Sequence, residues 1–172
     1  LVLYAAILWT ALELRVGAGV ATGPRRLVQA TTLVAALTIL AGGFVAGLRA
    51  GLDYNTFPLM TGQLVPDGYA RLSPFLLNWM ENIPAVQFNH RLLATLTALL
   101  AAASLVAGWQ SQARPGLLAL AIAVGMQYAL GVATLLYVVP VGLGTLHQTM
   151  AVLVLTTALV VLHQLRARPT PL

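Results

Sequence analysis

Residues 26–47 read RLVQATTLVAALTILAGGFVAG, and no charged side chain follows Arg26 within this stretch. A helix needs about 20 mostly apolar residues to cross the hydrocarbon core of a bilayer. Three further apolar runs of similar length follow, at 89–109, 115–137 and 144–165. These lengths favour helices, because a transmembrane barrel strand needs only about 10 residues of alternating polarity. The sequence therefore predicts four transmembrane helices.

The composition of the whole chain is also typical of a membrane protein. Of 172 residues, 59% are hydrophobic and 8% are charged, whereas a soluble domain carries about 25% charged residues. The chain contains no Cys, which excludes disulfides, iron–sulfur clusters and Cys-ligated haem or zinc. We expect an all-α fold, a polytopic transmembrane four-helix bundle preceded by a helix remnant.

The segments outside these spans differ in length. Residues 1–14 are apolar but too short to cross a bilayer, and we expect them to be the end of a truncated transmembrane helix. Residues 15–25 form a short link and 166–172 a short tail. The bundle occupies 26–165, and its long connection, 48–88, contains four prolines. We expect that connection to cap one end of the bundle at the membrane surface.

Arginines predict which side of the membrane each connection faces. One face collects six arginines and a single acid, Glu13, and so carries the whole net charge of +5. The arginines on this face are Arg15, Arg25, Arg26, Arg114, Arg166 and Arg168. Three arginines and three acids cancel on the opposite face. By the positive-inside rule, the link 15–25 and the tail 166–172 are cytoplasmic and the loop 48–88 lies outside.

Two of the three histidines lie near the outer ends of their predicted helices. His90 is the second residue of 89–109 and His147 the fourth of 144–165. Both spans begin on the outer side, so the two imidazoles are expected at nearly the same depth. Histidines on facing helices at one depth can fill both axial positions of a haem iron. We predict His90 and His147 as metal ligands, with hydrogen-bonded interfacial histidines as the alternative.

Other side chains are interpreted relative to this pair. Arg91 is predicted to bind a haem propionate, and the alternative is an arginine that snorkels to the interface. His163 lies 16 residues beyond His147, about 24 Å along the helix, and is interpreted as interfacial. Met150 fits packing better than a ligand role.

Small and polar residues on the same helices allow two interpretations. The small residues would leave room for a flat macrocycle, or they would simply let helices pack closely. They are Ala94, Thr97, Ala101 and Gly108 after His90, and Gly144, Ala151 and Ala158 around His147. Three polar residues of 115–137 either line a pocket or bond across helices, and we favour the second. They are Gln127, Tyr128 and Thr134.

The chain resembles the C-terminal half of the haem A synthases across all four spans. The sequence VQFNHR at 86–91 resembles their haem-ligand motif. GGFVAGLRAG at 42–51, followed by YNTFPLM at 54–60, resembles the helix end and loop that precede this motif. LGVATLL at 130–136 and LHQ at 146–148 resemble the last two helices. The combination is specific, although each piece alone is weak.

This resemblance implies a function and a set of partners. The family's enzymes have two similar four-helix halves and oxidise a methyl group of haem O, producing haem A for cytochrome c oxidase. The chain would then hold a haem b iron between His90 and His147, with Arg91 also binding the cofactor, and accept electrons. Implied partners are membrane lipid, haem O, haem O synthase and the oxidase assembly machinery, with a homo-oligomer left open and no nucleic acid. The implied location is a bacterial inner membrane.

The chain departs from the family pattern in one large respect. The half that carries the substrate haem and a catalytic glutamate is missing, and no carboxylate here matches that glutamate, since Asn89 precedes His90 and Glu81 lies in the loop. We therefore predict haem b binding without turnover, and no catalytic residue. The alternatives are a stand-alone bis-histidine b-type electron carrier and a metal-free transporter or scaffold. The absence of acids within the spans counts against transport.

Overall fold

The computed structural model describes residues 1–14 and 24–166, which form five α-helices and two short 3-10 helices. The predicted link 15–25 and tail 166–172 lie largely outside the described residues. No β-strand occurs within the described ranges, so the all-α prediction is confirmed. The elements are α1 (Val2–Glu13), α2 (Arg25–Gly47), η1 (Ala50–Leu52), η2 (Phe75–Trp79), α3 (Ile83–Ala107), α4 (Arg114–Leu136) and α5 (Val141–Gln164).

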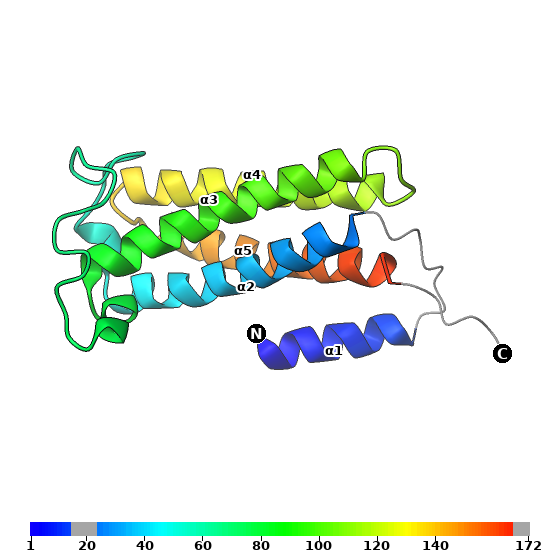
Figure 1. The fold of residues 1–172 in the computed structure, drawn as a ribbon, viewed down its shortest axis with the longest axis horizontal. Helices are drawn as coiled ribbons and strands as arrows, with labels where there is room; N and C mark the ends of the chain where they lie inside the picture. Colours follow the sequence, from blue (N-terminus) through cyan, green and yellow to red (C-terminus); the bar gives the residue numbers. More distant parts are fainter. Residues whose placement is uncertain (15–23, 167–172) are drawn as a thin grey trace.

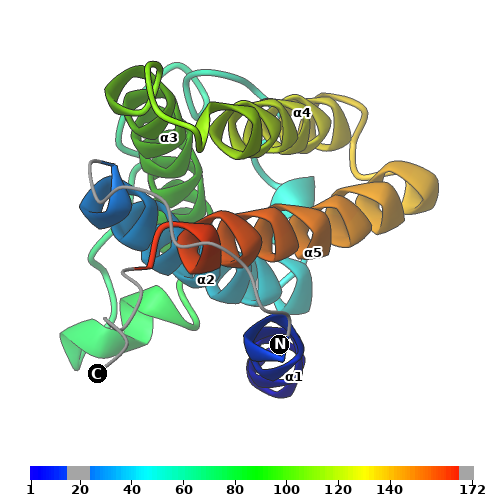
Figure 2. The same cartoon turned by 90° about the vertical axis from the view of Figure 1, so that its right-hand side faces the viewer.

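Four long helices pack side by side into a bundle (Figure 1). In the end view, α3 and α4 form one layer and α2 and α5 the other, and α1 lies outside the bundle against α5 (Figure 2). Segment 48–82 and the turn 137–140 lie together at one end, which we call the loop end. The opposite end carries the turn 108–113 and Arg25, Arg26, Arg114 and Arg166, and we call it the arginine end.

Each of the helices α2 to α5 is long and apolar enough to cross a membrane. Large apolar side chains also project from the surface of the bundle, with exposed fractions between 51 and 63% for Leu33, Leu40, Leu99, Ile122 and Leu153. Extended apolar surface of this kind is rare on soluble monomers and marks contact with lipid or another protein. These features identify the chain as a multi-pass membrane protein.

Helix α3 begins at Ile83, six residues before the predicted start at 89. The Asn82 side chain caps its first turn by accepting a hydrogen bond from the backbone N–H of Ala85, and Pro84 occupies a position where no N–H is needed. The predicted start was placed too late because it was drawn where the apolar run begins, and the capping residue was not considered. The connection is therefore 48–82, and His90 lies about two turns into its helix.

Helix α5 likewise begins earlier than predicted, at Val141 after Pro140. His147 is therefore its seventh residue, also about two turns from the loop end. The two histidines thus sit at similar positions along two helices that start at the same end. Both helices start earlier than predicted, so the two histidines still lie at similar depths.

Apolar packing fills the middle of the bundle and the arginine end. The middle cluster is Ala35, Ala101, Leu120, Ala123, Val124, Met150, Val154 and Ala158. The arginine-end cluster is Val28, Ala113, Leu117, Val161 and Leu165. Two pairs of hydroxyl groups bond between α2 and α3. The oxygens of Thr31 and Ser104 are 3.2 Å apart, and those of Thr38 and Thr97 are 3.0 Å apart. Most of this packed core lies away from the loop end.

Helix α1 is held to α5 at the arginine end. Glu13 pairs with Arg166, and His163 Nε2 lies 3.6 Å from Glu13 Oε1. The His163 ring packs edge-on against Trp9, with 5.3 Å between ring centroids, and is only 8% exposed. His163 is therefore covered by α1, at the end of the bundle opposite to the other two histidines.

Candidate functional site

A cavity of about 990 Å³ occupies the loop-end half of the bundle. Its wall is built by α2, α3, α4 and α5 together with the segment that follows α2. The volume is at the upper end of the range of about 300–1,000 Å³ that is typical of ligand pockets. His90 and His147 both line it, whereas Met150 lies in the apolar core and His163 lies elsewhere. The structure therefore brings together the two histidines that the sequence singled out.

The His90 imidazole is oriented by helix α2. Its Nδ1 lies 3.1 Å from the backbone carbonyl oxygen of Thr38, which can only accept a hydrogen bond. Nδ1 therefore carries the proton, and Nε2 keeps a free lone pair. Histidines that bind metals usually donate their other ring N–H to such an acceptor, which fixes the tautomer and the ring orientation.

A glycine of α2 makes room for this ring. A Cβ built on Gly42 would lie 3.1 Å from Cε1 of His90, closer than ordinary van der Waals contact. The neighbouring Gly43 has nothing within 4 Å of such a Cβ. Gly42 thus acts as a seat for the imidazole, and Gly43 does not.

The His147 imidazole has the corresponding arrangement on helix α4. A Cβ built on Gly131 would lie 2.8 Å from Cε1 of His147. The Nε2 atom of the ring is 3.5 Å from Nε2 of Gln127, at the outer limit of a hydrogen bond. Among the described residues, His147 Nδ1 and Gln127 Oε1 are buried without a partner. A metal-binding imidazole needs one ring nitrogen that makes no hydrogen bond to the protein, and His147 has such a nitrogen beside a large cavity.

Arg91 lines the cavity, and its guanidinium holds the loop. Nη1 donates to the carbonyl oxygen of Thr56 at 2.9 Å and Nη2 to that of Tyr54 at 2.8 Å. The Gln87 amide donates to the same Tyr54 oxygen at 3.1 Å. Arg91 Nε is buried and has no partner in the described part of the chain. The Nε–H of Arg91 is thus left for a ligand, together with the N–H of Nη1 and of Nη2 that the loop carbonyls do not use.

The predicted stripes of small residues divide between cavity and core. Ala94, Thr97, Gly144 and Ala151 line the cavity. Ala101 and Ala158 pack in the apolar core instead. A Cβ on Gly108 would clash with the Leu117 side chain at 2.1 Å, so this glycine serves helix packing. The small residues therefore line the cavity at one depth of the bundle and serve helix packing at another.

The three polar residues of α4 all line the cavity. Two of them also bond across helices, as we favoured: the Tyr128 hydroxyl to Thr95 of α3, with 3.1 Å between the oxygens, and the Gln127 amide to His147 of α5 at 3.5 Å. The Thr134 hydroxyl donates to Leu130 of its own helix instead, so our preference was wrong for Thr134.

Sequence reasoning missed four contributors to the site. They are Thr38, Gly42, Gln127 as a neighbour of His147, and Gly131. Both glycines lie inside the motifs GGFVAGLRAG and LGVATLL, where their role as ring seats could not be read. Thr38 contributes its backbone carbonyl, which every residue type has, so the sequence gives no sign of this role.

The donor set of the cavity fits a haem better than a bare metal ion. Within residues 1–14 and 24–166, no group of three or more His, Cys, Asp or Glu side chains could hold a metal by itself. A haem iron already has four porphyrin nitrogens and needs only axial ligands from the protein. Two imidazoles with available nitrogens, glycine seats and a large, mainly apolar cavity meet that need.

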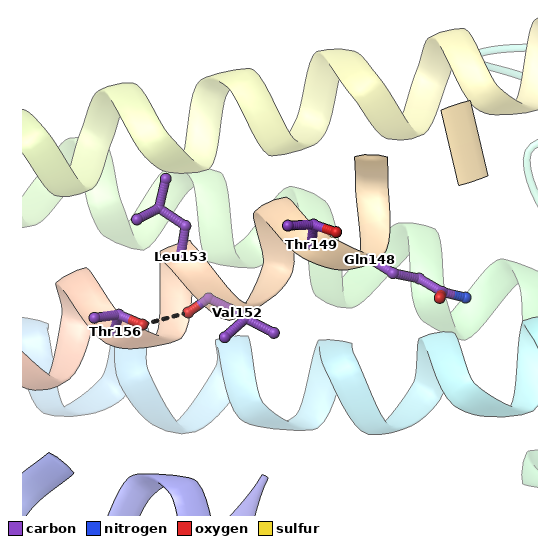
Figure 3. A pocket seen from close by; sticks show the side chains of 5 residues that line it. All are labelled: Gln148, Thr149, Val152, Leu153 and Thr156. Carbon is purple, nitrogen blue, oxygen red and sulfur yellow. Dashed lines mark hydrogen bonds between the residues drawn. The ribbon is translucent and has the colours of Figure 1, made fainter. Parts of the chain in front are cut away.

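A shallower groove of about 480 Å³ lies along the flank of α5 (Figure 3). It is lined by Gln148, Thr149, Val152, Leu153 and Thr156. The threonine hydroxyls in it already donate within the helix, Thr156 to Val152 at 2.7 Å and Thr149 to Thr145 at 2.9 Å. The groove therefore offers few polar groups for ligand recognition, and the central cavity is the stronger candidate.

Comparison with known proteins gives a consistent family likeness. A family model described as cytochrome oxidase assembly protein, COX15-CtaA, matches residues 1–159. The chain is 54% identical to the Heme A synthase of Granulibacter bethesdensis, over 96% of this chain and 45% of the relative. It is 42% identical to the Heme A synthase of Nitrosospira multiformis, over 95% of this chain and 49% of the relative.

A eukaryotic relative extends this likeness. The chain is 40% identical to Heme A synthase COX15 of Arabidopsis thaliana, over 86% of this chain and 33% of the relative. The chain thus spans half or less of the length of these curated relatives. No solved structure matches it significantly.

Proposed function

The chain belongs to the COX15-CtaA family of cytochrome oxidase assembly proteins, and from this premise we propose that it is the C-terminal, haem b-binding half of a haem A synthase. In this proposal the other half oxidises a methyl group of haem O, and this chain would hold the haem b that would supply the electron acceptor. The single observation that carries the proposal is that His90 and His147 line one cavity, each seated on a glycine of the neighbouring helix.

Each residue of the site has a distinct role in this proposal. His90 binds the iron through Nε2, because its Nδ1 proton is donated to the Thr38 carbonyl. His147 binds from α5, with Gln127 beside its ring. Arg91 closes the loop over the cavity and offers its Nε–H to a propionate. A haem bound in this way supplies a one-electron redox centre, while the apolar wall keeps water from it.

The charge pattern supports an orientation and a location. Within the described residues, the arginine end carries four arginines and one acid, Glu13. By the positive-inside rule we propose that this end and the C-terminus face the cytoplasm, and that the loop end faces outward from a bacterial inner membrane. The proposed partners are lipid, haem O, haem O synthase and the oxidase assembly machinery, which follow from the family.

An optical spectrum of the purified 172-residue chain tests the proposal. We expect a low-spin b-type spectrum, and a pyridine extract that identifies the pigment as haem b. His90→Ala and His147→Ala should each abolish the low-spin signal, because one axial ligand is lost. His163→Ala is the matched control, since this histidine lies at the opposite end, and it should keep the spectrum. An unchanged spectrum in either of the first two variants rejects the ligand assignment.

A further inference from the structure

The wall of the cavity carries two cations and no anion. Arg49 and Arg91 both line it, and no Asp or Glu does. Arg91 is half-buried beside this mainly apolar lining, where its charge is incompletely solvated, and Arg49 is exposed at the loop end; two cations without an anion favour a ligand of opposite charge. The cavity is therefore electrostatically suited to a ligand with acidic groups at the loop end.

The two arginines are not equally available to such a ligand. Arg91 already uses one N–H of Nη1 and one of Nη2 to hold the carbonyl oxygens of Thr56 and Tyr54, so its guanidinium is fixed by the loop and only its remaining N–H groups, among them the buried Nε–H, can serve a ligand. Within the described residues, Arg49 makes no side-chain hydrogen bond and no ion pair. All of the guanidinium donors of Arg49 therefore remain for a ligand, and a guanidinium can bind a carboxylate through two parallel hydrogen bonds.

The backbone of Arg49 adopts a conformation that is unfavourable for a residue with a side chain. Arg49 lies between α2 and η1 with φ 53° and ψ 27°, in the left-handed region. A glycine adopts this conformation without strain, and a side chain there costs roughly 1 kcal/mol or more. Strained residues of this kind tend to occur at functional sites such as ligand clamps. Gly47 and Gly51 flank the position closely, yet residue 49 is an arginine.

Resting on the haem-binding function proposed above, we propose that Arg49 binds one carboxylate of the haem at the loop end of the cavity, while Arg91 binds the second through Nε–H. The haem of this chain has two propionates, so one cation is available for each. Arg49 is then a further haem-binding residue, and it directs the carboxylate edge of the macrocycle toward the loop end. The iron would lie between the histidines.

Titration of the haem-free 172-residue chain with two porphyrins tests this assignment. The probes are ferric protoporphyrin IX and its dimethyl ester, which lacks both carboxylates. Arg49→Gly removes the guanidinium and relieves the left-handed strain, so the variant should fold at least as well as the wild type. We expect it to bind the diacid about tenfold more weakly, as for the loss of a charge-assisted hydrogen bond, and to bind the diester like the wild type.

Two further variants and a measurement of the haem midpoint potential complete the test. Arg49→Lys should recover part of the affinity, because it keeps the charge but not the bidentate geometry. Arg71→Gln is the matched control, because Arg71 lies in the same loop, is exposed and does not line the cavity; it should change neither affinity. The haem midpoint potential should fall in Arg49→Gly, since a nearby positive charge favours the reduced state.

The outcomes separate this inference from the function on which it rests. If Arg49→Gly weakens both porphyrins equally, or leaves diacid binding unchanged, Arg49 does not bind a carboxylate, and the histidine assignment still stands. If the wild-type chain gives no low-spin complex with either porphyrin, the proposed function itself fails, and the Arg49 assignment fails with it.

Discussion

Gly131 of α4 lies against His147 of α5 so closely that a Cβ built on the glycine would be 2.8 Å from Cε1 of the imidazole. Gly42 of α2 has the same relationship with His90 of α3, at 3.1 Å. Each helix pair thus repeats one device, in which a glycine on the first helix gives space to a histidine on the second. Because these contacts are steric, each glycine positions its ring without occupying a ring nitrogen.

Adding a methyl group at either seat should displace a histidine. Gly131→Ala and Gly42→Ala are expected to lower haem content or change the low-spin spectrum, with the larger effect at Gly131, where the space is smaller. The controls are Gly125→Ala on α4 and Gly47→Ala on α2, since a Cβ at either position has nothing within 4 Å and neither residue lines the cavity. Equal spectra for all four variants would rule out the seat interpretation.

Gln127 should tune the binding of a metal by His147. Its side chain lies 3.5 Å from His147 Nε2 and retains a buried, unpartnered oxygen. Loss of such a neighbour typically lowers metal affinity by about 10- to 100-fold. We expect Gln127→Ala to weaken haem binding by about tenfold in an equilibrium titration. Gln29→Ala, on the exposed surface of α2, is the same change away from the cavity and should have no effect.

Arg91 should keep the loop closed. Arg91→Ala removes the two hydrogen bonds to Tyr54 and Thr56, each made by a charged donor, and such bonds contribute roughly 1.5–3 kcal/mol. Backbone amides of segment 54–57 should exchange with deuterium at least tenfold faster, as measured by mass spectrometry. Arg71→Gln removes a positive charge from the same loop and should leave this exchange unchanged; equal rates in Arg91→Ala and the wild type would contradict the clamp.

The turn before α5 contains strain that a glycine can relieve. Val138 has φ 59°, and this β-branched side chain is 55% exposed, so little packing is lost on its removal. Val138→Gly should stabilise the chain by about 1 kcal/mol, seen as a higher thermal midpoint in detergent. Val141→Gly, at an 86% exposed position in the first turn of α5, meets no such strain and should be neutral or destabilising.

Only part of the site could be found from residue identities. His90 and His147 stood out because histidines are scarce in this chain and both occur near the starts of apolar runs. The Thr38 carbonyl, 52 residues away from His90 along the chain, became visible only when α2 was packed against α3. Arg91 was noticed because it follows His90, but its hydrogen bonds to loop carbonyls depend on where segment 54–56 folds back.

The sequence by itself determined the number of spanning helices, their all-α character and the end of the bundle at which the histidines lie. These properties follow from local hydrophobicity and chain length, because an apolar run of sufficient length must satisfy its backbone hydrogen bonds as a helix in lipid. Tertiary structure alone decided which ring nitrogen is free, which glycines seat the rings and which arginine remains available. Those properties depend on contacts between helices that are distant in sequence, and no single helix carries the information for both partners of a contact.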